Sequence, residues 1–317
     1  MRRFLFIILC IGLSFSAACR DKESSLPAEK DSASSSIIEA ETTESVSDVN
    51  EPAEATTAQP PEATTEEKIA EEEDDWLTDR NFRLSAHRGA VALAPENTLE
   101  AVRAAAEHGY GAVEIDPRLS SDGVIYLMHD RTVDRTTDGS GKVENMSSDK
   151  LDSLQIETDD YPEYEGTDVD VPLFEDAVSL LSEYDIVLNI DCSKGDWTDE
   201  DYIDQVMGIL EKYNMTEKSF FVISDWDARR ILHRRYPEAC VSWLYESSDD
   251  IYDEIAAIKQ YPRALLSVKD KYATDRMIRK LNESGIYYQV YKVNDYDRLE
   301  ELKDMGVPMV ETDDLLP

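Results

Sequence analysis

The chain has 317 residues and a formal net charge of −37 at pH 7, with 69 acidic against 32 basic side chains. Such a negative field repels nucleic acid and anionic membrane surfaces, so we expect neither as a direct partner. An anionic substrate would need a local positive centre, most simply a metal ion. The four cysteines form no Cys-x-x-Cys motif and no cluster with histidine, which argues against zinc and redox sites.

Residues 1–19 have the layout of an export signal: two arginines, an uninterrupted apolar run, then small residues that end at Cys19. The apolar run is too short for a membrane-spanning helix. A cysteine directly after Ala17 and Ala18 resembles the lipidation site of bacterial lipoproteins. We therefore predict an extracytoplasmic protein anchored by a lipid on Cys19, and the alternative is a secreted protein cut near Ala18.

Residues 20–75 are dominated by Ser, Thr, Glu, Ala and Pro and contain no aromatic residue. They show neither helical nor strand periodicity and cannot bury enough apolar surface to offset the entropy of ordering. We predict a disordered acidic tether over this stretch.

From Trp76 to the end, eight short apolar stretches alternate with helix-like stretches, several of which end in Gly. Eight strands linked by helices fit a (β/α)8 TIM barrel, of the α/β class, better than an open doubly wound sheet of fewer strands. Cys192 and Cys240 lie in or beside these apolar runs and are expected as buried free thiols. The predicted strands are 83–87, 112–119, 185–191, 220–224, 240–245, 264–269, 286–293 and 307–312.

The second link of the barrel is interrupted. Asp122-Gly123 predicts a turn followed by an alternating strand, and residues 131–172 show little periodicity. We predict a small insertion on the catalytic rim, and the sequence leaves open whether it contacts substrate or only packs as a cap.

Three carboxylates are expected to converge at the barrel mouth. Glu114 and Asp116 are two residues apart and would face the same way in a strand, while Asp191 ends the adjacent predicted strand. Buried together without a cation, these groups would repel each other and lose hydration. All-oxygen ligation suits Ca²⁺ or Mg²⁺, so we predict one divalent cation here, against the alternative of salt-bridged strand ends.

Two of the four histidines fall at the predicted catalytic rim. His87 ends the first predicted strand and His129 ends the hairpin strand, and this end of a barrel carries the catalytic groups. Such a pair can act as base and acid, although each alone could equally be structural. His108 and His233 fall in charged helical stretches, where we expect surface positions.

The loop after the first strand brings Arg88 beside His87, where a guanidinium would clamp an oxyanion such as phosphate. Gly89 would let the backbone approach the ligand closely. Residues 95–98 then end the loop and start the helix, with Asn97 or Thr98 as the N-cap.

The order and spacing of several motifs closely resemble the glycerophosphodiester phosphodiesterase family over roughly residues 83–314. The motifs are HRG at 87, PENT at 95, EID at 114, DG at 122, HD at 129, RTTDGSGKV at 135 and GVPMVETDD near the end. The resemblance implies a barrel enzyme that hydrolyses glycerophosphodiesters to glycerol 3-phosphate and an alcohol with a divalent metal. It implies metal ligation by Glu114, Asp116 and Asp191, phosphate binding by Arg88, and acid–base catalysis by His87 and His129.

Three departures from the family pattern bear on the substrate. Asp191 stands where the family usually has Glu, and Ser193 stands where it has Lys. Lys194 is the neighbouring candidate for binding substrate, but a shift of one residue along a strand would reverse its direction. Tyr291 occupies the place of the family's aromatic wall on the alcohol side, and Lys292 adds a charge that the family lacks.

Two other functions are compatible with these residues. One keeps the catalysis but changes the substrate to a phospholipid or a wall polymer with glycerophosphate links. The other is a surface lipoprotein that only binds a phospho-ligand on a decayed barrel, and the retention of both histidines and of Glu114 and Asp116 argues against it. For glycerophosphodiester hydrolysis the partner is a small-molecule phosphodiester, and no protein partner is implied.

Overall fold

The structure is a computed structural model that describes residues 75–317. The predicted leader and nearly all of the predicted tether, Cys19 included, lie outside the described residues. Within the part that is described, no helix is both long and apolar enough to cross a membrane.

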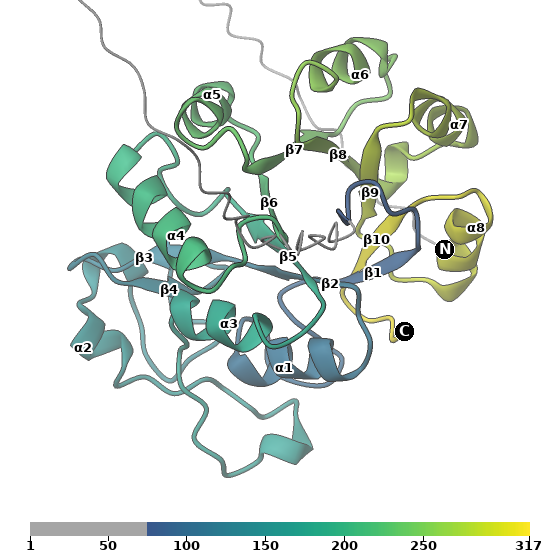
Figure 1. Cartoon of the computed structure of the whole chain (residues 1–317). Helices are drawn as coiled ribbons and strands as arrows, with labels where there is room; N and C mark the ends of the chain where they lie inside the picture. The colour runs from purple at the N-terminus through teal and green to yellow at the C-terminus, as the bar shows by residue number, and fades with distance from the viewer. Residues whose placement is uncertain (1–74) are drawn as a thin grey trace, which may run out of the picture. The chain divides into compact units, whose positions relative to one another are not determined.

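Eight parallel strands close into a barrel in the order β1-β10-β9-β8-β7-β6-β5-β2 (Figure 1). All eight predicted strands are present, which confirms the (β/α)8 fold. The barrel strands are β1 (Arg83–Ala86), β2 (Ala112–Ile115), β5 (Val187–Asp191), β6 (Ser219–Val222), β7 (Cys240–Tyr245), β8 (Ala264–Lys269), β9 (Tyr287–Tyr291) and β10 (Met309–Thr312).

Helices link successive strands and surround the barrel in Figure 1. Polar N-caps start several of them: the side chains of Thr98, Asp199, Asp225, Thr274 and Asp295 each accept a hydrogen bond from a first-turn amide. The linking helices are α1 (Leu99–Glu107), α3 (Phe174–Leu181), α4 (Glu200–Lys212), α5 (Trp226–Arg235), α6 (Tyr252–Ile258), α7 (Asp275–Ser284) and α8 (Tyr296–Asp304).

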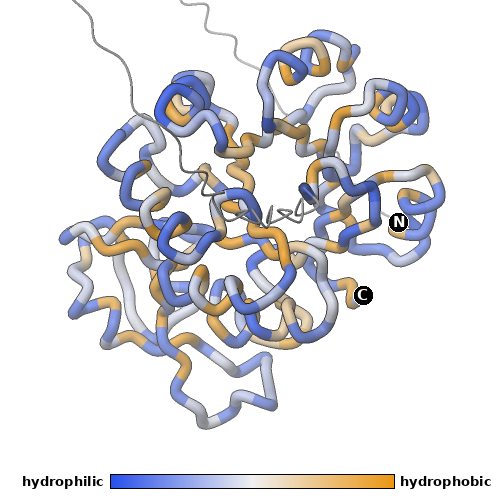
Figure 2. The backbone as a smooth tube through the Cα atoms, in the orientation of Figure 1, coloured by the Kyte–Doolittle hydropathy of each residue, from blue (hydrophilic) through white to orange (hydrophobic). Residues whose placement is uncertain are grey.

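Apolar side chains line the strands and the inner faces of the helices, while the outer helix faces are hydrophilic (Figure 2). A second, smaller cluster fills the barrel where the strands begin. At its centre Trp76 packs against Phe220 and edge-on against Tyr287, with ring centroids 5.6 and 5.3 Å away. The Trp76 indole also donates a hydrogen bond to the Glu217 carbonyl at 2.8 Å. Trp76 therefore closes the end of the barrel opposite the carboxyl ends of the strands. Cys192 and Cys240 are buried free thiols, as predicted.

The insertion after the second barrel strand begins with an antiparallel hairpin, β3 (Pro117–Leu119) and β4 (Ile125–Leu127). The predicted strand 112–119 is therefore two strands, broken at Asp116, where the chain leaves the barrel. The insertion continues through a 3-10 turn at Val143–Asn145, helix α2 (Ser148–Leu151) and a second 3-10 turn at Pro162–Tyr164. Its buried residues, including Tyr126, Leu151 and Leu154, form an apolar cluster of their own, and in Figure 1 it lies to one side of the barrel.

Candidate active site

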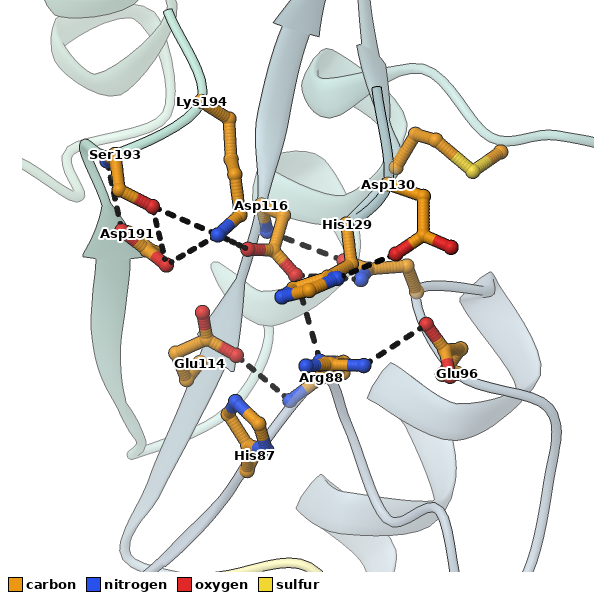
Figure 3. Close-up of polar contacts among 12 residues, drawn as sticks. His87, Arg88, Glu96, Glu114, Asp116, His129, Asp130, Asp191, Ser193 and Lys194 are labelled. Atoms are coloured by element: carbon orange, nitrogen blue, oxygen red, sulfur yellow. Dashed lines mark hydrogen bonds and ion pairs between the residues drawn. The ribbon is translucent and has the colours of Figure 1, made fainter. Parts of the chain in front are cut away.

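Three carboxylates meet at the carboxyl ends of β2 and β5. Ile115 pairs with Ile190 at the end of the ladder, and Asp116 and Asp191 are the residues that directly follow this pair. One oxygen each from Glu114, Asp116 and Asp191 lies within 4.8 Å of the others. Glu114 and Asp116 are almost completely buried. The predicted convergence is present (Figure 3).

The electrostatics of this cluster favour a cation. Burial, and then the charges of Asp116 and Asp191, raise the pKa of Glu114 well above its usual range. Burial and the charge of Asp191 likewise raise the pKa of Asp116. Glu114 Oε1 and Asp116 Oδ1 are buried without a hydrogen-bond partner among the described residues. An all-oxygen set with two buried oxygens that accept no hydrogen bond within the described chain fits a hard divalent cation.

Asn97 fixes Asp116 from two directions. Its side-chain Nδ2 donates a hydrogen bond to Asp116 Oδ2 at 2.7 Å, and its side-chain Oδ1 accepts one from the Asp116 backbone amide at 3.1 Å. Asn97 is buried and has a positive φ of 54°, a region that Asn tolerates better than most residues. The helix N-cap is Thr98, whose hydroxyl accepts from the Ala101 amide. Of the two residues predicted as the N-cap, Thr98 is the cap, and Asn97 instead holds the Asp116 carboxylate.

The Arg88 backbone and side chain both contact the cluster. Its amide donates to Glu114 Oε2 at 2.7 Å, and its guanidinium lies 3.9 Å from Asp116 and donates to Glu96 at 3.2 Å. The structure shows a packing reason for Gly89. A Cβ at Gly89 would lie 2.6 Å from the Ala101 Cβ, so the missing side chain lets the loop pack closely on α1, and the predicted approach to a ligand stays a prediction.

His87 stands at the end of β1 and lines the pocket at the mouth. Its Nδ1 lies 2.5 Å from Oδ1 of Asp313, which leaves Nε2 for a substrate. Burial lowers the pKa of His87, but the hydrogen bond to Asp313 and the charge of Glu311 outweigh it, and the net shift is upward. The bond to His87 in turn lowers the pKa of Asp313 to about 2.

His129 follows β4, two residues after the strand ends. Its Nδ1 lies 2.7 Å from Oδ1 of Asp130, so its Nε2 is also the nitrogen left for a substrate. His129 lines the same pocket as His87. The other histidines lie elsewhere: His108 is exposed, as expected, but His233 is half-buried and stacks on Tyr261 at 4.3 Å, so its predicted surface position is wrong.

Lys194 reaches into the site, contrary to the direction expected from a continued strand. β5 ends at Asp191, so the alternation of side chains stops before Lys194. Its Nζ lies 3.1 Å from Asp191 and 3.6 Å from Asp116, and it donates to the Ser193 hydroxyl at 2.7 Å. This ammonium and the hydrogen bonds from Ser193 outweigh the effect of burial and lower the pKa of Asp191.

The opposite wall of the pocket comes from β7 and β9. Tyr291 is buried and donates its hydroxyl hydrogen bond to Glu246 at 2.6 Å. Lys292 is exposed but also borders the cavity, which has a volume of about 330 Å³. This size suits a small ligand.

Glu311 adds a further carboxylate to the pocket that the motifs did not single out. It lies on β10, is buried, and accepts a hydrogen bond from Asn189 at 2.8 Å. Burial raises the pKa of Glu311 to about 7, opposed by the charge of His87.

Comparison with known proteins identifies the chain. The sequence profile described as the glycerophosphoryl diester phosphodiesterase family matches residues 87–316, which include all of the groups above. The chain belongs to this family. It is thereby an enzyme of the phosphodiesterase class with the barrel fold that the motifs implied.

Individual relatives and solved structures match this phosphodiesterase over different shares of the chain. The Bacillus subtilis protein YqiK is 25% identical over 233 residues, which cover 73% of this chain and 94% of that protein. The mouse protein named glycerophosphodiester phosphodiesterase 1 is 41% identical over 106 residues, about a third of each chain. A solved structure of an Oleispira antarctica phosphodiesterase with the product sn-glycerol-3-phosphate has a TM-score of 0.65 at 23% identity, and the match covers 73% of this chain and 93% of that one.

All eight predicted site residues of the phosphodiesterase line or adjoin one pocket. Sequence reasoning missed Asp313, Asp130 and Glu311, although each stands in or beside a quoted motif. An acidic residue directly after a predicted rim histidine, or at the end of the last strand, was the available signal. The sequence did not indicate that Asp313 pairs with His87 and Asp130 with His129.

Proposed function

We propose that this phosphodiesterase hydrolyses glycerophosphodiesters to glycerol 3-phosphate and an alcohol. The observation that carries the proposal is the convergence of three carboxylates within 4.8 Å, two of them with a buried oxygen that accepts no hydrogen bond from a described residue, in a pocket that also holds two histidines and Arg88. We assign Glu114, Asp116 and Asp191 as ligands of one Ca²⁺ or Mg²⁺. When bound, such a cation would neutralise charge on the non-bridging oxygens of the phosphate.

The two histidines divide the proton transfers. Neutral His87, with Nδ1–H held by Asp313, accepts through Nε2 the proton of the attacking hydroxyl, either water or the substrate's own 2-OH. Attack by the 2-OH forms a cyclic phosphate, which one water then opens to glycerol 3-phosphate. His129, held by Asp130, donates a proton from Nε2 to the leaving alkoxide. Arg88 and Lys194 add positive charge beside the phosphate, and Tyr291 lines the alcohol side.

The relatives support the substrate class. The Oleispira antarctica structure carries sn-glycerol-3-phosphate as its product, and the mouse relative is named for glycerophosphodiesters. A phospholipid or a wall polymer with glycerophosphate links stays the alternative substrate, because Tyr291 and Lys292, which depart from the family pattern, both line the pocket. A module that only binds phosphate is disfavoured, since both histidines keep carboxylate partners that orient them.

The test is release of glycerol 3-phosphate by the purified chain from glycerophosphocholine and glycerophosphoethanolamine, with Ca²⁺, with Mg²⁺ and with chelator. We expect metal-dependent release, and loss of most turnover in His87→Ala and in His129→Ala. His233→Ala is the matched control, because His233 lies outside the pocket. Folded protein with no release under either metal would contradict the proposal.

We also propose that residues 1–19 direct export and that a lipid on Cys19 anchors the protein outside the cytoplasm through the tether of residues 20–75. Metabolic labelling with a radioactive fatty acid should mark the wild-type chain and not a Cys19→Ser variant. An unlabelled wild-type chain in the culture medium would instead indicate plain secretion.

A further inference from the structure

Residues from three of the quoted motifs meet at one point beside the pocket. Glu96 belongs to the PENT motif, Asp130 follows His129 in the HD motif, and Arg135 opens the RTTDGSGKV stretch of the insertion. Arg135 donates Nη1 and Nη2 to the two oxygens of Glu96 at 2.8 and 2.7 Å. Its Nε donates to Asp130 Oδ2 at 2.7 Å. One guanidinium thus uses three of its donors to join the β1–α1 loop to the residue beside His129.

Asp130 connects Arg135 to the imidazole of His129. Asp130 binds Arg135 through Oδ2 and His129 through Oδ1, at 2.7 Å in each case. The Asp130 carboxylate is therefore held from both sides, and its plane sets the direction of the imidazole. On the other side, Glu96 is also bound by Arg88 at 3.2 Å, so Glu96 keeps a partner of its own if Arg135 is lost.

The geometry of Arg135 suits it to holding the Asp130 carboxylate in a fixed orientation. A planar guanidinium that binds a carboxylate with two parallel hydrogen bonds is fixed in direction as well as in distance, which a lysine ammonium cannot reproduce. The hydrogen bond from Arg135 is the largest of the effects that lower the pKa of Asp130, so this carboxylate stays ionised as an acceptor for Nδ1–H. Removing the orienting acceptor of a catalytic histidine frees its tautomer and its ring angle.

We propose that Arg135 is a positioning residue of the phosphodiesterase, which locks Asp130 so that His129 presents protonated Nε2 to the leaving alkoxide. The inference rests on the proposed function, because it takes His129 as the general acid. It makes the insertion part of the catalytic apparatus and not only a cap.

The experiment compares two substrates with the same glycerophosphoryl group. Glycerophosphocholine releases an alkoxide that needs a proton, whereas glycerol 4-nitrophenyl phosphate releases a phenolate that does not. In Arg135→Gln, kcat for glycerophosphocholine should fall about 10- to 100-fold, which is part of the roughly 100- to 10,000-fold that general acid catalysis contributes. The kcat for the nitrophenyl substrate and both KM values should change little. Arg135→Lys should give an intermediate loss.

The matched control is Arg131→Gln. Arg131 lies in the same insertion and binds Glu144 through Nε and Nη2, but among the described residues its side chain makes no hydrogen bond to a residue of the pocket. Equal loss with both substrates would show that Arg135 merely supports the fold, and no loss beyond that of Arg131→Gln would also overturn the inference. If the wild-type chain released nothing from either substrate, the proposed function itself would fail, which is a distinguishable result.

Discussion

Asn97 holds Asp116 by the side chain and by the backbone amide at once, so this candidate metal ligand has little freedom to turn away. The Asn97 side chain is therefore a support for the metal site, and replacing it should weaken cation binding without removing a ligand.

Asn97→Gly removes the amide but keeps a residue that tolerates the positive φ at this position. We expect the metal concentration for half-maximal activity to rise about 10- to 100-fold, as is usual when a supporting hydrogen bond of a ligand is lost. The measurement is activity against Ca²⁺ and Mg²⁺ concentration. Asn145→Gly, at an exposed position, is the control and should leave the curve in place.

Asp313 sets the protonation of His87. Because its hydrogen bond and charge raise the pKa of His87, Asp313→Asn should lower that pKa. His87 works as a base only when neutral, and activity is lost as the pH falls through its pKa. The acidic limb of the kcat/KM profile should therefore move to lower pH, while the plateau drops because the ring is less well oriented. The exposed neighbour variant Asp314→Asn should keep the wild-type profile, and a limb that moved to higher pH would contradict the assignment.

At the scale of elements, the junction of β1 and α1 depends on the closeness of two backbones. A methyl group at Gly89 would lie 2.8 Å from the backbone carbon of Ala101, in a loop where φ is +84°. Gly109, at the other end of α1, has nearly the same φ of +85° but no neighbour within 4 Å of an added Cβ. A side chain at Gly89 would therefore meet both a steric clash and backbone strain, whereas a side chain at Gly109 would meet backbone strain alone.

Gly89→Ala should lower the free energy of unfolding by roughly 2–5 kcal/mol, from strain and overpacking together. Gly109→Ala should cost only about 1 kcal/mol, because it meets the backbone strain alone. Urea unfolding of the two variants measures the difference. Equal losses would mean that α1 shifts easily and that its packing does not fix the HRG loop.

The helices and strands also show which features of the structure could be predicted from the sequence. The barrel strands were predictable because each is a short apolar run bounded by helices, and the carboxylates were predictable because alternation and strand ends place them. The end of β5 before Lys194 was not predictable, since the apolar pattern carries no mark of where the chain turns. The pairs His87–Asp313 and His129–Asp130 depend on loop conformations, for which periodicity gives no information.

At the scale of the whole molecule, Trp76 ties the start of the described chain to strands from all around the barrel. Trp76→Ala should cost about 3–5 kcal/mol, the usual loss for a large buried aromatic side chain. Trp226→Ala is the control, because Trp226 is 57% exposed, and its loss should stay near 0.5 kcal/mol. Thermal and urea unfolding of both variants of the whole chain check this. A mild effect at Trp76 would mean that the barrel closes without it.

The same tryptophan decides from which side the enzyme can be held. Since the chain enters the barrel at the end where the strands begin, and the pocket opens where they finish, a linker joined ahead of residue 75 is attached on the far side from the mouth. The enzyme can therefore be coupled to a bead or a sensor surface through its N-terminus with the pocket still facing the solution, whereas coupling through the loops after the strands would block entry.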